Sequence, residues 1–148
     1  MEIERKYLIH ALPSDLSSWK SRRIEQAYLC TDPVVRIRRS DEEYYMTYKS
    51  RGLLVREEYN LPLTQKAYEH LKTKADGIIL AKTRYLHPLT DTLTIELDVF
   101  DAPYEGLYLA EVEFPDEASA NAFTPPAWFG EDVTFSTRYH NSTLSKGL

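Results

Sequence analysis

Hydrophobic and polar residues alternate with a period of two along most of the chain, as they do in half-buried β-strands. This pattern covers residues 2–10, 25–31, 34–40, 43–50, 53–61, 78–87, 92–100 and 107–114. Turn-forming residues separate several of these segments, including Asp32-Pro33 and Ser40-Asp41-Glu42. Eight short strands at such regular spacing predict an antiparallel barrel or sandwich.

Helical periodicity is confined to a few segments. Between Thr64 and Asp76 apolar residues recur at helical spacing, with Thr64 as the candidate N-cap and Gly77 as the candidate stop. Shorter helices or helical turns are expected over 14–20, 116–123 and 136–148. The fold class expected from the pattern is therefore mainly β (α+β).

The chain has 148 residues, 43% of them hydrophobic, and shows no linker, repeat or low-complexity tract. This predicts one domain over 1–148. No segment approaches the roughly 20 apolar residues of a membrane helix, and Met1-Glu2-Ile3-Glu4 does not open a signal peptide. One cysteine, Cys30, excludes an intrachain disulfide and is expected to be buried. These features favour the cytoplasm.

The net charge is −5, which argues against nucleic acid as a partner because the phosphate backbone favours a basic surface. The charge is unevenly distributed along the chain. Residues 1–49 contain 9 Lys and Arg against 8 Asp and Glu, whereas residues 99–148 contain 2 against 8. A fold that joins these two parts can place cations and carboxylates in one site.

Charged residues share one face of nearly every predicted strand, because alternate side chains of a strand point to the same side. The aligned sets are Glu2, Glu4 and Lys6; Arg36 and Arg38; Arg56, Glu58 and Asn60; Lys82 and Arg84; Glu96 and Asp98; Glu111 and Glu113; and Lys49 with Thr47 and Tyr45. A sheet with one solvated face is the simplest interpretation. However, like charges two positions apart repel each other, so surface stability does not require them. A water-filled channel is the second interpretation.

A channel of this kind suits a phosphate chain and a divalent metal. Glu2, Glu4, Glu111 and Glu113 offer the hard oxygen ligands that Mg²⁺ or Mn²⁺ prefers. The cations exceed what a single phosphate needs, and Arg and Lys both bind phosphate. The cationic set is Lys6, Arg36, Arg38, Lys49, Arg56, Lys82 and Arg84.

These residues resemble the motifs of the CYTH superfamily, the triphosphate tunnel metalloenzymes. The opening Glu2-Ile3-Glu4-Arg5-Lys6 is similar to its ExExK signature, and later motifs agree in order from about residue 2 to residue 144. These motifs are Gln26-Ala27-Tyr28-Leu29, Arg36-Ile37-Arg38, Thr47-Tyr48-Lys49, Lys82-Thr83-Arg84-Tyr85, Glu96-Leu97-Asp98-Val99-Phe100, Ala110-Glu111-Val112-Glu113-Phe114, Gly130-Glu131-Asp132-Val133-Thr134 and Arg138-Tyr139-His140-Asn141.

The resemblance implies an eight-stranded antiparallel β-barrel tunnel with a few helices packed outside, and metal-dependent hydrolysis of a linear triphosphate. It implies metal binding by the four glutamates named above and triphosphate binding by the cations. It also implies a catalytic tyrosine–lysine pair, which would be Tyr28 and Lys49. Glu58, Glu96, Asp98 and Arg138 are further candidates, with Asp98 open between metal ligand and arginine partner.

One departure from the family pattern concerns the strand of Arg56 and Glu58. Relatives often carry a second glutamate where this chain has Asn60, which weakens a metal-binding role for that strand. The remaining candidates read as structural: Trp19 and Trp128 as core residues, His10 and His70 as surface residues, and His87 and His140 as lacking metal-ligand spacing.

Several functions stay open at this level. The compact chain favours an inorganic triphosphatase acting on tripolyphosphate, with nucleoside triphosphates and longer polyphosphate as further candidate substrates. Class IV adenylate cyclase and thiamine triphosphatase are alternatives within the superfamily. A non-catalytic polyphosphate-binding module would need the cations but not both glutamate pairs. A barrel for an apolar ligand conflicts with the charged faces. The sequence leaves the oligomeric state open.

Overall fold

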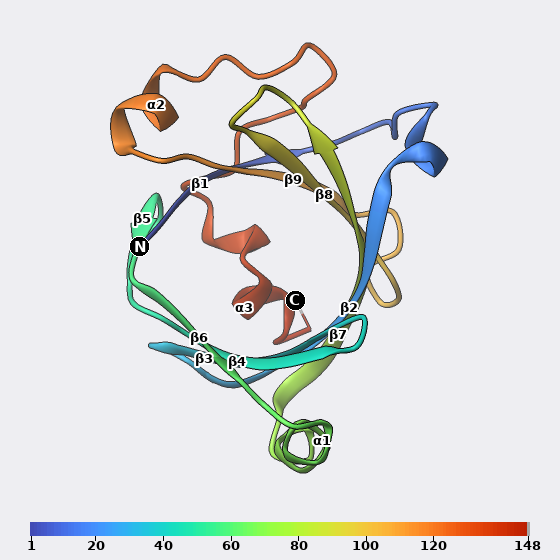
Figure 1. Cartoon of the computed structure of the whole chain (residues 1–148), viewed down its shortest axis with the longest axis vertical. Helices are drawn as coiled ribbons and strands as arrows, with labels where there is room; N and C mark the ends of the chain where they lie inside the picture. Colours follow the sequence, from blue (N-terminus) through green and yellow to red (C-terminus); the bar gives the residue numbers. More distant parts are fainter. Residues whose placement is uncertain (148) are drawn as a thin grey trace.

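The computed structural model describes residues 1–147, and its strands form one antiparallel sheet that curls into a barrel (Figure 1). Along the sheet the strands follow the order β5-β1-β9-β8-β7-β2-β3-β4-β6. Their bounds are β1 Glu2–Leu8, β2 Lys20–Thr31, β3 Val34–Ser40, β4 Glu43–Lys49, β5 Val55–Arg56, β6 Glu58–Pro62, β7 Asp76–Pro88, β8 Thr94–Phe100 and β9 Tyr108–Glu113.

The two edges of the sheet are consecutive in the chain, and this closes the barrel. β5 pairs with β1, placing Arg56 opposite Glu2, and β6 pairs with β4, placing Glu58 opposite Lys49. Only Glu57 separates β5 from β6. The prediction of an antiparallel barrel is confirmed. The sheet has nine strands rather than eight because the predicted strand 53–61 divides its pairing between β1 and β4.

The barrel is charged inside and apolar outside. The faces with Tyr7, Ile95, Leu97, Ala110 and Val112 point outward and join one buried cluster. Helix α2 (Glu117–Ala122) and the chain that follows it cover this cluster, and Figure 1 shows them outside the barrel wall formed by β1, β9 and β8. The opposite faces of the same strands point into the barrel and bear the carboxylates and cations.

Helix α1 (Gln65–Lys72) covers a second part of the outer wall. Its Thr64 N-cap accepts a hydrogen bond from the Ala67 amide at 3.0 Å, as predicted. The fully buried Tyr68 packs against Ala27 and Ile37. The stop was predicted wrongly: the helix ends at Lys72, and Gly77, with φ of 81°, lies inside β7 instead.

The predicted helix over 14–20 is only a 3-10 turn, η1 (Leu16–Ser18), because β2 begins already at Lys20. The predicted helix over 116–123 is α2, and its Asp116 carboxylate accepts a hydrogen bond from the Ser119 amide at 2.6 Å. Two environment predictions were also wrong. Cys30 is exposed near the end of β2, and Trp128 is 37% exposed while contacting the edge of Trp19.

The C-terminal segment contradicts the prediction that the helices pack outside. It forms the 3-10 turn η2 (Thr137–Tyr139) and helix α3 (Asn141–Leu144), and Figure 1 shows α3 within the ring of strands. Leu144 is buried in a cluster with Val34, Phe100 and Leu109. An apolar side chain of α3 therefore packs against the inner wall of the barrel, which explains its position.

No helix in residues 1–147 is long and apolar enough to cross a membrane.

The outer core predicts the response to truncation. Leu97 is fully buried, so Leu97→Ala is expected to lower the free energy of unfolding by about 2–5 kcal/mol through lost burial and a cavity. Leu61 on β6 is 54% exposed, so Leu61→Ala serves as the matched control. Urea unfolding of both variants measures the difference, and equal losses would contradict this assignment of the core.

Candidate active site

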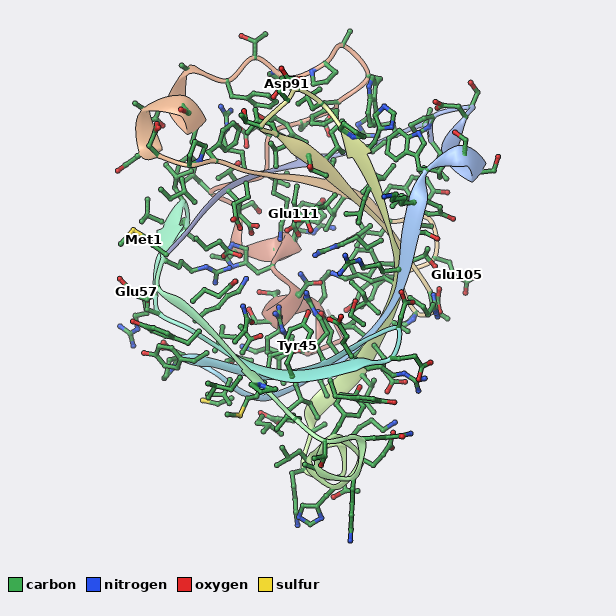
Figure 2. The ribbon with its side chains drawn as sticks, in the orientation of Figure 1. Met1, Tyr45, Glu57, Asp91, Glu105 and Glu111 are labelled. Atoms are coloured by element: carbon green, nitrogen blue, oxygen red, sulfur yellow. The ribbon has the colours of Figure 1, made fainter. Side chains whose placement is uncertain are left out.

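A polar cavity of about 140 Å³ lies inside the barrel. Figure 2 shows Glu111 and Tyr45 inside the ring of strands, whereas Glu57 and Glu105 lie outside it. The cavity is lined by Glu2, Glu4, Lys6, Tyr28, Val34, Arg36, Arg38, Tyr45, Lys49, Arg56, Glu58, Asn60, Arg84, Glu96, Glu111, Glu113, His140, Asn141 and Ser142.

Strand register pairs most of these charges with opposite charges. Lys6 lies opposite Glu111 in the ladder, and their Nζ and Oε1 atoms are 3.6 Å apart. Lys49 lies opposite Glu58, with Nζ 3.3 Å from Oε2. Because an isolated buried charge is costly, this pairing makes a charged interior compatible with folding.

The ion-pair group with the shortest distances among the buried charges consists of Asp98, Arg84 and Lys82 in the barrel wall. Asp98 is fully buried and bonds Arg84 at 2.7 and 2.9 Å and the Lys82 ammonium at 2.6 Å. Burial, with the charges of Arg84 and Arg38, lowers the pKa of Lys82 to about 7 despite the opposing effect of Asp98. Lys82 and Asp98 do not line the cavity, so Asp98 is placed as the partner of an arginine.

Two cavity arginines, Arg36 and Arg38, are exceptions to this pairing, because neither forms an ion pair with a carboxylate within residues 1–147. Arg38 donates from Nε and Nη2 to the Gln26 amide oxygen at 2.9 and 2.5 Å. Arg36 donates to the Thr47 hydroxyl at 3.2 Å. Both partners are neutral, so no carboxylate compensates either guanidinium charge beside the cavity. They are the cations best suited to an anionic ligand.

Two carboxylates are the complementary exceptions. Glu4 and Glu113 lie opposite one another on β1 and β9, and neither has an ion pair within residues 1–147. Burial, with the charges of Glu111 and Glu2, raises the pKa of Glu4 well above its usual range. Partial desolvation and the charges of Glu2 and Glu58 also raise the pKa of the exposed Glu113. The missing counter-charge here is a cation, and a divalent metal fits this oxygen donor set.

A third group lies at the seam between β1, β5 and β4. Glu2 accepts two hydrogen bonds from Lys49 Nζ, at 3.1 and 3.0 Å, and lies 3.7 Å from Arg56 Nε. Burial raises the pKa of Glu2 against the effect of Lys49. Burial would also raise the pKa of Glu58, but hydrogen bonds with Glu2 and Asn60 and the charge of Lys49 lower it to about 2.

Within residues 1–147, no three carboxylate, histidine or cysteine groups form a ready-made metal coordination set. Two of the four predicted glutamate ligands instead form ion pairs with lysines, Glu2 with Lys49 and Glu111 with Lys6. Metal binding by all four therefore requires these ion pairs to exchange partners.

Tyr28 and Lys49 both line the cavity, but no hydrogen bond between them occurs within residues 1–147. Tyr28 acts electrostatically on Lys6, whose pKa is raised by Glu111 and Glu4 and, less strongly, by Tyr28, against the effect of burial. Arg138 is exposed, stacks over the Tyr139 ring and does not line the cavity. The roles assigned to these residues stay predictions.

The cavity also contains residues that the sequence reasoning missed or dismissed. His140, Asn141 and Ser142 come from the C-terminal segment, which was read as lying outside the barrel. Asn60 connects the wall: it accepts a 2.6 Å hydrogen bond from Thr47 and donates to Glu58 at 3.2 Å. The alternation of β6 contained this signal, because Asn60 shares the face of Glu58.

The comparisons with known proteins agree with this geometry. The CYTH domain model matches residues 1–146. The inorganic triphosphatase of Nitrosomonas europaea is 42% identical over 150 aligned residues, which cover 99% of this chain and 98% of that relative. The chain belongs to the CYTH domain family.

Further comparisons extend this result. An inorganic triphosphatase of Acetivibrio thermocellus is 35% identical, covering 98% of this chain and 93% of the relative. A solved structure of an inorganic triphosphatase matches with a TM-score of 0.73 and 38% identity, covering 100% of this chain and 96% of that chain. A Hippeastrum protein, described as a putative adenylyl cyclase with dominant triphosphatase activity, shares the fold alone, at 16% identity over 82% and 83% of the chains, TM-score 0.63.

The raised pKa of Glu4 predicts a pH- and metal-dependent stability. Above the folded pKa the ionised Glu4 lowers stability, whereas below the ordinary pKa of about 4.3 both states are protonated and the penalty is absent. Glu4→Gln is therefore expected to raise Tm at pH 8 in EDTA and to have no such benefit near pH 4. Mg²⁺ should raise Tm of the unsubstituted protein more than that of the variant.

Thermal unfolding at both pH values measures these shifts. Glu105→Gln, in an exposed turn, is the matched control. A Tm for Glu4→Gln at or below that of the unsubstituted protein at pH 8 would contradict the unpaired state of this carboxylate.

The buried group predicts a large loss of stability on removing its carboxylate charge. Asp98→Asn leaves Arg84 and Lys82 buried with a neutral partner, and is expected to lower the free energy of unfolding by about 3–5 kcal/mol. Asp101→Asn, which removes the carboxylate of an exposed pair with Arg23, should cost under about 1 kcal/mol. Urea unfolding at pH 7 compares the two variants.

Proposed function

We propose that this protein is an enzyme that hydrolyses linear inorganic triphosphate inside the barrel. The observation that carries the proposal is the pair of exceptions to charge compensation: within residues 1–147, Arg36 and Arg38 form no ion pair with a carboxylate, and Glu4 and Glu113 form none with a cationic side chain. A triphosphate with a divalent metal supplies both missing partners at once, because it brings anionic oxygens and a cation into one cavity. The full-length similarity to inorganic triphosphatases supports the same substrate.

Mg²⁺ or Mn²⁺ is the proposed metal, because the available ligands are carboxylate oxygens. Glu4 and Glu113 would hold it. Glu2 and Glu111 would join them if Lys49 and Lys6 exchanged these carboxylates for phosphate oxygens. When bound, the metal neutralises charge on the phosphate oxygens. The released lysines, Lys49 and Lys6, are then free to bind the substrate.

The protein's own residues would align the phosphate chain for attack by water. Arg36 and Arg38 bind non-bridging oxygens, and Arg84, held by Asp98, presents a fixed guanidinium group in the wall. Water forms a new P–O bond to a terminal phosphorus, the bridging P–O bond breaks, and orthophosphate and pyrophosphate leave with the protons of the water distributed between them. Stabilisation of the charge that develops on the equatorial oxygens is the main catalytic contribution.

Tyr28 and Lys49 are proposed to act at the reacting phosphate. Lys49 could supply positive charge to the leaving oxygen when it is not bonded to Glu2, and the Tyr28 hydroxyl could donate a hydrogen bond to the same oxygen. The family resemblance supports this pair, and both side chains line the cavity.

We further propose a cytoplasmic location and a small-molecule substrate. Nucleic acid is not proposed as a partner, in keeping with the net charge of −5.

The central test measures phosphate and pyrophosphate release from tripolyphosphate, ATP and thiamine triphosphate with Mg²⁺, Mn²⁺ or EDTA. Metal-dependent release with tripolyphosphate preferred is the expected result. Cyclic AMP with pyrophosphate from ATP would replace the proposal by an adenylate cyclase, and preference for thiamine triphosphate would replace it by that hydrolase. Tight triphosphate binding without any turnover would indicate a binding module.

Substitutions of a cavity arginine and of two cavity glutamates test the proposed roles of these side chains. Arg38→Ala is expected to lower kcat/KM for tripolyphosphate by at least about 100-fold, since a charged hydrogen-bonding group in contact with the reacting phosphates is lost. Arg39→Ala, on the adjacent outward-facing position of β3, is the matched control and should change kcat/KM by less than about threefold.

Glu2→Ala and Glu111→Ala should remove most metal-dependent turnover while the fold survives. Unchanged rates in both glutamate variants would refute the metal assignment.

A further inference from the structure

Two cations, Lys20 and Arg22, lie at the start of β2 on one face of the strand, because they are two positions apart. Arg22 lies opposite Arg84 in the ladder between β2 and β7, and Lys20 lies opposite Leu86. Residues that face each other across a ladder share a face of the sheet, and Arg84 lines the cavity. Lys20 and Arg22 therefore belong to the inward face of the barrel wall.

Exposure to solvent rises along this inward face. On β2, Ile24 is 2% exposed, whereas Arg22 and Lys20 are exposed. On β7, which is the neighbour of β2 in the wall (Figure 1), Arg84 is buried and Pro88 at the strand end is exposed. Both strands thus lead from the buried interior to a rim that solvent reaches, and Lys20 and Arg22 stand on that rim.

The two rim cations have no partner in the protein. No hydrogen bond or ion pair involves the side chain of Lys20 or Arg22 in the part of the chain that the structure describes. By contrast Arg23, the next residue on the outward face of β2, forms an ion pair with Asp101. Like charges on one strand face repel each other, so folding does not explain this pair of cations. An anion from outside is the partner that they lack.

Carboxylates occupy other parts of the same rim. Three acidic residues at the turn between β3 and β4 line a shallow pocket with Arg22 but form no ion pair with it within residues 1–147. They are Asp41, Glu42 and Glu43. Glu113 at the end of β9 is also exposed. Because carboxylates repel phosphate, the path of least repulsion for a phosphate chain that leaves the cavity runs over the start of β2.

We propose that Lys20 and Arg22 bind the part of a phosphate chain that extends beyond the cavity, which makes them specificity-determining residues for chains longer than triphosphate. The inference rests on the proposed function and extends it to the length of the substrate. Ammonium and guanidinium groups both bind the non-bridging oxygens of phosphate, which are repeated along the whole chain. A longer chain gains these contacts at the rim, whereas a triphosphate bound by the cavity cations gains little from them.

The test compares kcat/KM for a homogeneous linear polyphosphate several units longer than triphosphate with kcat/KM for tripolyphosphate. Lys20→Gln/Arg22→Gln removes both charges and keeps polar side chains. This rim variant should lower the ratio of the long chain to tripolyphosphate about tenfold at low salt, because two exposed contacts with phosphate are lost. The effect should shrink as the salt concentration rises, since exposed charges are screened.

Arg23→Gln/Lys74→Gln removes two exposed cations that lie away from the inward rim, and is the matched control for net charge. Its ratio should equal that of the unsubstituted protein. An unchanged ratio in the rim variant would overturn the proposal. An equal loss with both substrates would also overturn it, because the cations would then attract anions in general. Lys20 and Arg22 are exposed and unpaired within residues 1–147, so the rim variant should keep the Tm of the unsubstituted protein.

A binding measurement separates this inference from the proposed function. If the protein hydrolyses neither chain, the proposed function fails, and calorimetric titration with the same two chains tests the rim by itself. The rim variant should then lose about tenfold more affinity for the long chain than for tripolyphosphate. Equal losses, or no binding of the long chain to the unsubstituted protein, would overturn the role of Lys20 and Arg22.

Discussion

Compensation of charge inside a barrel is the constraint on which the rest of this structure depends. A wall lined with carboxylates and cations is stable only where each charge has a partner, since a lone buried charge is very costly. Antiparallel register provides most of these partners, as in the opposition of Arg84 to Asp98 and of Lys6 to Glu111. The few charges left without a partner then define where an external ligand is needed.

This division explains why the fold and the site differ in how far they could be predicted. The period of two in the sequence was enough to assign the strands and to place Glu2, Glu4 and Lys6 on one face. It could not show that Arg38 rests on Gln26, because that contact depends on the register between β2 and β3. The family resemblance supplied roles for Tyr28 and Lys49, but their separation depends on packing across the barrel, which alternation does not encode.

The position of the C-terminal segment was the main error, and its signal was present in the sequence. Leu8, Val34 and Leu109 share the faces of the charged residues, so they break the charged pattern just where a strand begins or ends. In a tunnel filled with water along its whole length they would be exposed apolar residues. Their presence required an apolar cover, and Leu144 belongs to the segment that supplies it. Reading the faces to their ends would have shown this.

The seam of the barrel has a consequence for its motion. β1 and β5 face each other at only two register positions, Glu2 with Arg56 and Ile3 with Val55, while the other side of β1 pairs with β9 at five. Local opening is easiest where the ladder is shortest, so the amide hydrogens of β5 should exchange with solvent before those of the β2–β7 ladder. Glu2 lies at this seam. The part of the wall that has to give up a carboxylate to a metal is thus also the part that the backbone restrains least.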